Sequence, residues 1–237
     1  MRRSYQTVFN AVMITLVAAN ASAAQGMEET KAVAGGGISV KGWAGRIDPS
    51  EEKAGQKLEN AKFTKKGKAL HVTTGPAVVY WHRKDSAKGN YTVKATFTEP
   101  KYMNLNNHPH PYGIVVGGND MGTENQTYLY CAAYGTGSFI VRGFGPAPFR
   151  LNGGRGESND AVHKAAGPGL PVTQEIAVSV KGDKVECAIN GTTVGSYNKS
   201  DVVGAGKLKS MDGAYGIRSG HNTEVLVTGL KMAKGKN

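Results

Sequence analysis

Residues 108–145 read HPHPYGIVVGGNDMGTENQTYLYCAAYGTGSFIVRGFG, and this stretch decides the fold class. Apolar runs at 113–116, 128–133 and 139–141 are separated by Gly-Gly and Gly-Thr-Gly, which is typical of short strands joined by tight turns. The gaps between these runs carry His, Asn, Asp and Tyr, whose side chains can hydrogen-bond to a polar ligand or hold an ion. The stretch therefore predicts both a sheet and a binding surface on it.

The rest of the chain repeats this pattern. Apolar and polar residues alternate strictly at 90–98 and at 174–180, which predicts strands with one buried face. The Asn-Gly pair at 190–191 is a strong hairpin signal. A dozen or so strands joined by hairpins predict an all-β fold of two antiparallel sheets packed face to face.

Helical signals are confined to two short segments. Residues 48–57 predict a short helix with Asp48 as its cap and Pro49 in its first turn, and residues 200–203 predict one further turn. No repeat of 20 to 50 residues is present, which excludes propellers and solenoids.

The N-terminus has the pattern of an export signal. Two arginines precede an apolar run, and Ala21-Ser22-Ala23 matches a small-residue cleavage site. We expect residues 1–23 to be a signal peptide, 24–37 a disordered leader and 38–237 a single β-sandwich domain. The apolar run is shorter than the roughly 20 residues a membrane span needs, so we expect an exported protein, periplasmic or secreted, with no span after cleavage.

The chain is basic, with a formal net charge of +11. A basic surface can dock to nucleic acid or to an anionic polysaccharide, or it can simply keep an exported protein in solution. The aromatic-rich segments are not the basic ones, which argues against a stacking platform for single strands. We therefore expect no nucleic acid partner.

The two cysteines each lie in a strand-like run. Cys131 alternates with Leu129 and Ala133, and Cys187 alternates with Val185 and Ile189, so both are expected to face the core. Export permits a disulfide between them, and two buried thiols are the alternative.

The order of motifs resembles a known superfamily. Gly42-Trp43, Gly89-Asn90-Tyr91-Thr92-Val93, the run PYGIVVGG at 111–118 and the run GAYGIR at 213–218 occur in this order. The chain is similar to the concanavalin A-like lectin/glucanase superfamily, and most similar to exported bacterial 3-keto-disaccharide hydrolase-like domains. This resemblance implies a jelly-roll sandwich whose concave sheet face holds carbohydrate. The Glu-x-Asp-x-Glu string of the retaining glucanases of this fold is absent, and the strand at 128–133 lacks an acid, which lowers the case for hydrolysis.

The histidine pair is the first candidate site. Pro109 and Pro111 keep the run extended, so His108 and His110 point the same way and could share a sugar or a metal ion, next to Tyr112. Two histidines at this spacing need a third ligand, which His82, His163 or His221 could supply. A rigid exposed loop is the alternative.

The loop after Gly118 supplies the acidic candidates. Asn119, Asp120 and Glu124 offer oxygen atoms to a divalent cation such as calcium, although their spacing is not that of an EF-hand. An Asx turn uses the same residue types. Asp120 and Glu124, with His110, are the candidate catalytic residues for acid–base chemistry.

Aromatic and basic side chains complete the predicted site. Its remaining ligand-binding candidates are Trp81, His82, Tyr128, Tyr130, Arg142, Arg218 and His221. Aromatic faces stack on sugar rings, and Arg and His donate to hydroxyl groups. Core packing and ordinary polar loops are the alternatives for these residues.

Three functions remain open from the sequence. The first is an exported carbohydrate-binding protein that holds a glycan on the concave sheet face. The second is a glycoside hydrolase that acts on glycosides, including 3-keto glycosides. The third is a non-catalytic envelope or adhesion protein that docks to anionic polymer.

Overall fold

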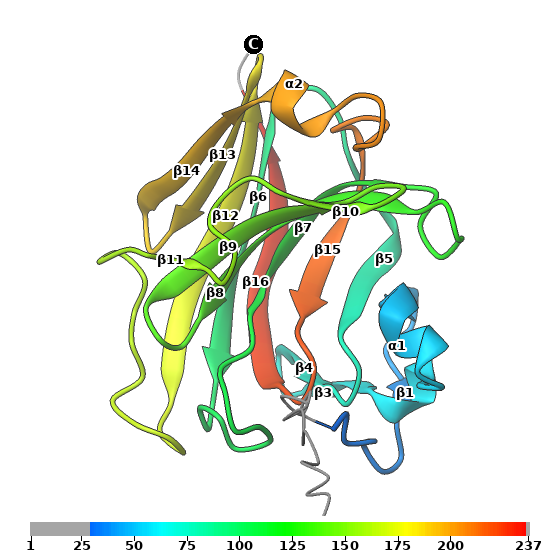
Figure 1. Ribbon diagram of the computed structural model, residues 1–237, viewed down its shortest axis with the longest axis vertical. Helices are drawn as coiled ribbons and strands as arrows, with labels where there is room; N and C mark the ends of the chain where they lie inside the picture. The colour runs from blue at the N-terminus through cyan, green and yellow to red at the C-terminus, as the bar shows by residue number, and fades with distance from the viewer. Residues whose placement is uncertain (1–28, 236–237) are drawn as a thin grey trace, which may run out of the picture.

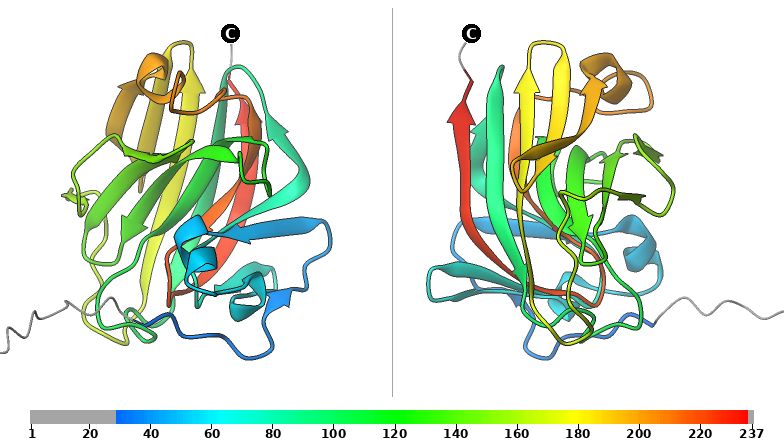
Figure 2. Two further views of the ribbon diagram at one scale, coloured as in Figure 1. Left: turned by 45° about the vertical axis from the view of Figure 1, so that its right-hand side comes forward. Right: turned by 90° about the vertical axis from the view of Figure 1, so that its left-hand side faces the viewer.

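The computed structural model describes residues 29–235. These residues form two large sheets that pack face to face (Figures 1 and 2). The pairings between neighbouring strands are antiparallel except for β1 with β3. The predicted all-β, two-sheet antiparallel jelly-roll sandwich is confirmed.

The first sheet contains the first and the last strand of the described chain, β1 and the long β16. Its order is β1-β3-β4-β16-β6-β12-β13-β14. Its strands are β1 (Gly37–Ile38), β3 (Lys62–Lys66), β4 (Ala69–Thr73), β6 (Tyr91–Glu99), β12 (Val172–Lys181), β13 (Lys184–Ile189), β14 (Thr192–Asn198) and β16 (Glu224–Lys234).

The second sheet carries the stretch from which the fold was predicted. Its order is β10-β9-β8-β7-β15-β5-β2, and β11 also pairs with β9. Its strands are β2 (Trp43–Ile47), β5 (Val78–Ala87), β7 (Tyr112–Asn119), β8 (Thr127–Tyr134), β9 (Ser138–Phe144), β10 (Pro148–Arg150), β11 (Glu157–Ser158) and β15 (Gly213–Ser219).

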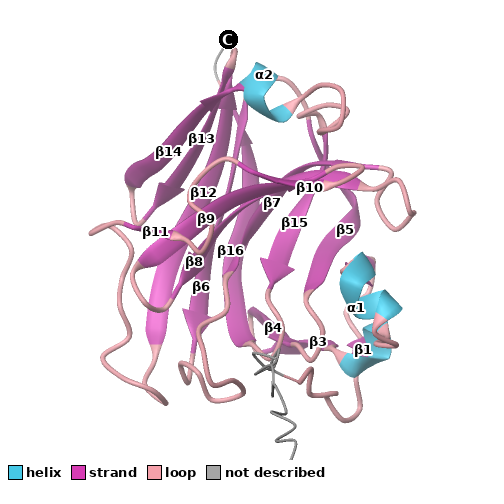
Figure 3. Ribbon diagram, in the orientation of Figure 1, coloured by secondary structure: helices cyan, strands magenta, loops and turns pink. Residues whose placement is uncertain are grey.

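Little of the chain is helical (Figure 3). The helices are α1 (Pro49–Lys53), the 3-10 turn η1 (Leu58–Asn60) and α2 (Lys199–Val202), close to the two segments predicted. Asp48 does precede α1, but its side chain makes no capping hydrogen bond. That part of the prediction is wrong, because the Asp48 carboxylate is held by an arginine from the second sheet.

Strict alternation places one face of each central strand in the core between the sheets. On β6 the residues Tyr91, Val93, Ala95 and Phe97 are buried, as the sequence predicts. The facing strand β8 contributes Leu129, Cys131 and Ala133 to the same cluster. The opposite face of the second sheet carries a separate aromatic cluster, and this is the face where the candidate site lies.

A disulfide joins the two sheets across the core. Cys131 on β8 is bonded to Cys187 on β13, so the bridge and not the pair of free thiols is present. The bridge ties the strand that carries the aromatic cluster to the opposite sheet.

The N-terminal segment departs from the expected disordered leader over residues 29–37. The backbone of Val33 donates to Asn60, and that of Lys31 donates to the side chain of Asn222. Gly37 and Ile38 then form β1 beside β3. Composition suggested disorder because the segment is polar and glycine-rich, but its backbone groups find partners on the sandwich. The predicted signal peptide and residues 24–28 lie outside the described residues.

Within the described residues, none of the helices has the length and apolar character required to cross a bilayer.

The disulfide should account for a large share of stability. Cys131 and Cys187 are 56 residues apart, and closing a loop of that size in the unfolded chain corresponds to about 4 kcal/mol. We expect reduction to lower the free energy of unfolding in urea by roughly that amount. A Cys131→Ala/Cys187→Ala variant should unfold identically with and without reductant; a wild type indifferent to reductant would contradict the structure.

Glu99 gives a second test of the core, through its pH dependence. Burial raises the pKa of Glu99 from 4.5 to about 7, against the lowering effect of the hydrogen bond from the Met103 backbone N–H. The folded state therefore holds the proton of the Glu99 carboxyl group more tightly than the unfolded state does. As a result, the free energy of unfolding falls as pH rises from about 4.5 through about 7. Relative to Glu99→Gln, the wild type should lose about 3 kcal/mol of unfolding free energy over that window.

The comparison with Glu99→Gln isolates this group, because the other titrating residues are common to both proteins. Urea unfolding curves at closely spaced pH values measure the difference directly. A difference that does not change with pH would show that Glu99 titrates normally.

Candidate functional site

Two adjoining cavities lie on the face of the second sheet that points away from the core. Their volumes are about 360 and 660 Å³, and both are lined by His110, Tyr134 and Arg142. We call the two together the cleft. Its other polar and aromatic lining includes Asp48, His108, Tyr130, Phe144, Arg150, Arg155, Arg218 and His221.

Strand register explains why these residues meet. Arg150 on β10 pairs with Arg142 on β9, and Arg142 pairs with Tyr130 on β8, so the three form a row across the sheet. Strand neighbours in register share a face. In the adjacent row Gly113 lies between Ala132 and Arg218. Ala132 is fully buried, whereas Arg218 lines the cleft and forms part of its floor.

Arg218 is the buried cation of the cleft. Its two terminal nitrogens donate to the two carboxylate oxygens of Asp48, with an Nη1–Oδ1 distance of 2.6 Å. Its guanidinium carbon lies 5.5 Å from the ring centroids of both Tyr130 and Phe144, which is cation–π geometry. Only 6% of the Arg218 side chain is exposed.

The surroundings of Arg218 keep it charged. Burial alone would lower the pKa of Arg218, but the Asp48 carboxylate, with Tyr128 and Tyr130, outweighs burial and raises the pKa above its usual value. The bidentate fork also fixes the plane of the guanidinium. Arg218 is therefore a permanently charged part of the floor.

Three histidines lie together at the edge of the cleft. The ring centroids of His108 and His110 are 4.3 Å apart, and those of His110 and His221 are 3.9 Å apart. One ligand atom from each of the three lies within 4.8 Å of the other two. His108 is exposed, whereas His110 and His221 are half-buried.

The loop that carries His221 is fixed by its neighbours. The Gly220 backbone donates to the carbonyl of Pro111, and the Gly220 carbonyl accepts from the Thr74 hydroxyl at 2.6 Å. A side chain at position 220 would meet His110 Cβ at 3.0 Å. Glycine at this position therefore permits the close approach that places His221 beside His110.

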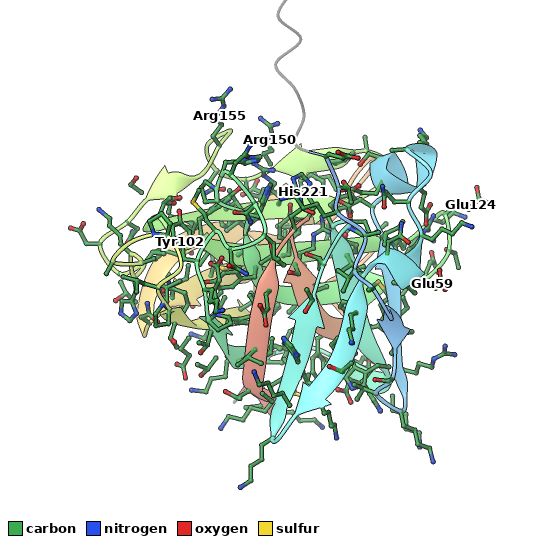
Figure 4. All side chains as sticks on the ribbon, turned by 90° about the horizontal axis from the view of Figure 1, so that it is seen from below. Glu59, Tyr102, Glu124, Arg150, Arg155 and His221 are labelled. Carbon is green, nitrogen blue, oxygen red and sulfur yellow. A yellow bond between two sulfur atoms is a disulfide. The ribbon has the colours of Figure 1, made fainter. Side chains whose placement is uncertain are left out.

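The cleft has an excess of positive charge. Arg142, Arg150, Arg155 and Arg218 line it. Among the described residues that line it, Asp48 is the one carboxylate, and it is already paired with Arg218. Arg142 lies where the two cavities join and donates to the carbonyl of Gly154 at 2.7 Å. In Figure 4, Arg150, Arg155 and His221 lie along one side of the molecule.

The structure brings together six of the residues predicted for the site. They lie on four different segments, namely the loop before β7, and strands β8, β9 and β15 with the loop after it. The six are His108, His110, Tyr130, Arg142, Arg218 and His221. Their roles toward a ligand stay predictions.

The acidic candidates lie elsewhere. Asp120 and Glu124 follow β7, whereas the histidines precede it, and a strand of eight residues separates its ends by roughly 23 Å. Asp120 has a left-handed backbone (φ 51°) in the turn and pairs with Lys209. Figure 4 likewise shows Glu124 far from His221. Joint acid–base work of these acids with His110 is therefore excluded in this arrangement.

Asn119 belongs to the turn rather than to the site. Its side-chain amide donates to the carbonyls of Gly117, Ser210 and Asp212 at 3.0–3.1 Å. These contacts hold the β7–β8 turn against the segment before β15. In these contacts the Asn119 side chain acts as a donor to backbone carbonyls, and both the Asx turn and the calcium loop stay predictions.

Four aromatic or histidine candidates are also outside the cleft. Tyr112 is fully buried between the sheets, where its ring stacks on Phe97. Tyr128 shares the face of Tyr130 but is fully buried against Phe144.

The other two lie at the far side of the second sheet. Trp81 lines a separate hollow with Arg83 and Met121. His82 points to the opposite face of β5, where it contacts Trp43 and Asp85. These positions correct the predicted ligand contacts, because strand alternation assigns a face but not how far that face is covered.

Sequence reasoning missed several lining residues. Tyr134 continues the alternation of Tyr128 and Tyr130 and could have been found from that period. Asp48 could not, because its partner Arg218 is 170 residues away in the chain. Arg150 and Phe144 flank a Gly-Pro turn that carried no signal for a site.

Comparisons with known proteins agree with this fold. No family model and no curated protein matches the chain. The carbohydrate-binding module CBM66 from Bacillus subtilis has a TM-score of 0.53 at 6% identity, covering 84% of this chain and 99% of that one. A Bacillus subtilis protein of unknown function with a galectin-like fold has a TM-score of 0.54 at 9% identity, covering 82% and 90%.

A third solved structure is an enzyme. The family 16 glycoside hydrolase endo-glucanase from Bacteroides ovatus has a TM-score of 0.52 at 12% identity, covering 81% of this chain and 94% of that one. Together these structures show that the chain shares their overall fold, the jelly-roll sandwich that the motif order suggested. The finer resemblance to 3-keto-disaccharide hydrolase-like domains stays a prediction.

The buried ion pair generates a stability prediction. Asp48→Ala should cost about 3–5 kcal/mol of unfolding free energy, because it leaves the Arg218 charge buried and uncompensated. Adding Arg218→Met to Asp48→Ala should restore part of that loss. The exposed pair Lys181–Glu186 supplies the control, where Lys181→Ala should cost less than about 1 kcal/mol. If urea unfolding shows equally small losses of unfolding free energy for Asp48→Ala and Lys181→Ala, the Asp48–Arg218 pair is not a buried structural ion pair.

Proposed function

We propose that this protein binds carbohydrate in the cleft. The observation that carries the proposal is the row of aromatic and guanidinium side chains on the outer face of the second sheet, from Arg150 through Arg142 to Tyr130. Tyr130 itself is buried beneath Arg218, so the partly exposed Tyr134 and Phe144 offer the aromatic surface of the cleft. Aromatic faces pack on the apolar faces of sugar rings, and guanidinium groups donate to sugar oxygens. Several polar groups that converge beside aromatic side chains can fix the orientation of such a ligand.

The fold supports the same proposal. CBM66 is a carbohydrate-binding module, and the endo-glucanase from Bacteroides ovatus acts on glycans, on the same jelly-roll architecture. Fold alone does not assign function. The chemistry of the cleft is therefore the stronger support, and the fold makes carbohydrate the expected ligand class.

The charge of the cleft favours an acidic glycan. The cleft carries arginine charges in excess of carboxylates, and planar guanidinium groups match carboxylate and sulfate oxygens in pairs. A neutral sugar would leave this charge uncompensated when it displaces water. We infer that uronic acid or sulfated units are bound in preference to neutral units.

No observation favours hydrolysis over binding. The predicted acids Asp120 and Glu124 lie at the other end of β7, and Asp48 is held by Arg218. Docking to an acidic envelope polymer is a special case of the proposed binding, because it would use the same charged residues. Binding without turnover is therefore the function that this arrangement supports best.

Binding and its charge preference can be measured together. Calorimetric titration with oligogalacturonides and with neutral gluco-oligosaccharides should give tighter binding of the acidic series, weakening as salt is added. Arg142→Gln should weaken binding of the acidic series about tenfold or more, since a hydrogen bond to a charged group contributes about 1.5–3 kcal/mol. The variant should keep its fold, because Arg142 is half-buried at the cleft wall.

Two control variants make the result specific. Arg83→Gln removes the same charge in a separate hollow and should leave binding unchanged. Glu124→Gln, in the distant loop, should also leave it unchanged. Equal affinity for both series would overturn the acidic preference alone, and binding insensitive to Arg142→Gln would overturn the cleft as the site.

A further inference from the structure

The three histidines at the edge of the cleft form a distinct cluster. Among residues 29–235, His108, His110 and His221 are the single group of metal-ligating side chains close enough to hold one ion. A tetrahedral metal keeps nitrogen ligands at about 2.0–2.1 Å and therefore roughly 3.3 Å from one another. The ligand atoms here lie within 4.8 Å, so the rings need to close by about 1.5 Å at most.

The backbone around the cluster is held in place, so that this closure is confined to side-chain torsions. Two prolines fix the backbone of His108-Pro109-His110-Pro111, and the Gly220 backbone is bonded to Pro111. On the other side of His221, the Asn222 side chain bonds to the backbones of Glu29 and Lys31. Ligands on fixed backbone lose little conformational freedom when they bind an ion.

Two of the histidines have an oxygen acceptor at the nitrogen Nδ1. His221 Nδ1 lies 3.5 Å from Glu51 Oε1, and His108 Nδ1 lies 2.7 Å from Asn107 Oδ1. Glu51 is itself fixed by hydrogen bonds from Thr30 and from the Ala77 backbone. A metal-bound histidine commonly donates its second ring N–H to such an oxygen, which orients the ring and directs Nε2 to the ion.

We propose that His108, His110 and His221 bind a divalent transition-metal ion, of which zinc is the representative. Three neutral imidazoles suit zinc and other first-row transition metals. Calcium prefers oxygen ligands, so three imidazole nitrogens do not suit it. The site is thus distinct from the calcium loop expected near Asp120. Glu51 acts as the positioning residue for His221.

Three protein ligands leave at least one coordination position for another donor. His110 and His221 both line the cavity that contains Arg218 and Tyr130, so this position faces the cleft. A water molecule or an anionic oxygen of a bound ligand would occupy it. The inference goes beyond carbohydrate binding and does not depend on it, because it concerns the ion alone.

Metal binding can be tested without any sugar. The full protein, stripped with EDTA and dialysed, is titrated with Zn²⁺ by calorimetry and with Co²⁺ by visible absorption, which reports the ligand set. We expect saturation at one ion per chain and competition between the two metals. Calcium should produce no thermal stabilisation, whereas zinc should raise the unfolding temperature.

Variants assign the ion to these residues. His108→Ala, His110→Ala and His221→Ala should each weaken zinc binding at least tenfold, and Glu51→Gln should weaken it about tenfold. His163→Gln is the matched control, since His163 is an exposed histidine on another part of the surface, bonded to the Thr173 carbonyl. Unfolding of each metal-free variant checks that the fold is retained.

Each outcome decides the inference. Stoichiometric zinc binding that the three histidine variants weaken, and that His163→Gln leaves unchanged, supports the site. Absence of saturable binding, or binding that these variants leave unaltered, overturns it. Neither result changes the outcome of the glycan titration with Arg142→Gln, so failure of the metal site and failure of the carbohydrate proposal remain distinguishable.

Discussion

The buried ion pair between Arg218 and Asp48 is the interaction on which the outer face of the second sheet depends. It links β15, at the middle of that sheet, to the segment that leads from the edge strand β2 into α1. Burying two charges costs free energy that the bidentate contact and the flanking rings of Tyr130 and Phe144 offset. The main effect of the ion pair is therefore to fix the position of the segment at Asp48 against β15, rather than to add a large net stabilisation.

One consequence concerns the histidine cluster. Because Asp48 is held by Arg218, α1 begins at a fixed point beside β5 (Figure 1), and Glu51 in its first turn reaches His221. The position of Arg218 in the floor of the cleft and the position of His221 at its edge are thus linked through Asp48 and α1. A change at Asp48 would disturb both, although the histidines lie in other loops.

Much of the fold followed from the sequence, because its signals are local. Alternation at 90–98 and 174–180 predicted strands with one buried face. The same reasoning predicted that Cys131 and Cys187 face the core, and the structure joins them there. The helix at 49–53 was predicted, but the role of Asp48 was not. A residue suited to capping is equally suited to an ion pair, and only tertiary contacts decide between the two.

The site was predicted less well for a related reason. Alternation correctly put Tyr128 and Tyr130 on one face, yet it could not show that both are buried there and that Tyr130 alone of the two borders the cleft. Asp120 and Glu124 were chosen because they flank the expected binding strand, but β7 separates them from His110, which lies before its other end. His221 was only one of three candidates for the third histidine, because strand order alone brings β15 beside β7.

The two proposals together place two kinds of electron-accepting group in the cleft, which would contact different parts of a ligand. Fixed guanidinium groups recognise the planar pairs of oxygens in a carboxylate or sulfate, whereas an ion held by imidazoles would accept a single oxygen atom. A ligand that satisfies both needs an acidic group and a second oxygen on adjacent positions, as an acidic sugar has. Neutral glycans offer only hydroxyl groups, and these displace water from arginine at little gain. On the binding that we propose, charge rather than shape is therefore the property by which the cleft selects its ligand.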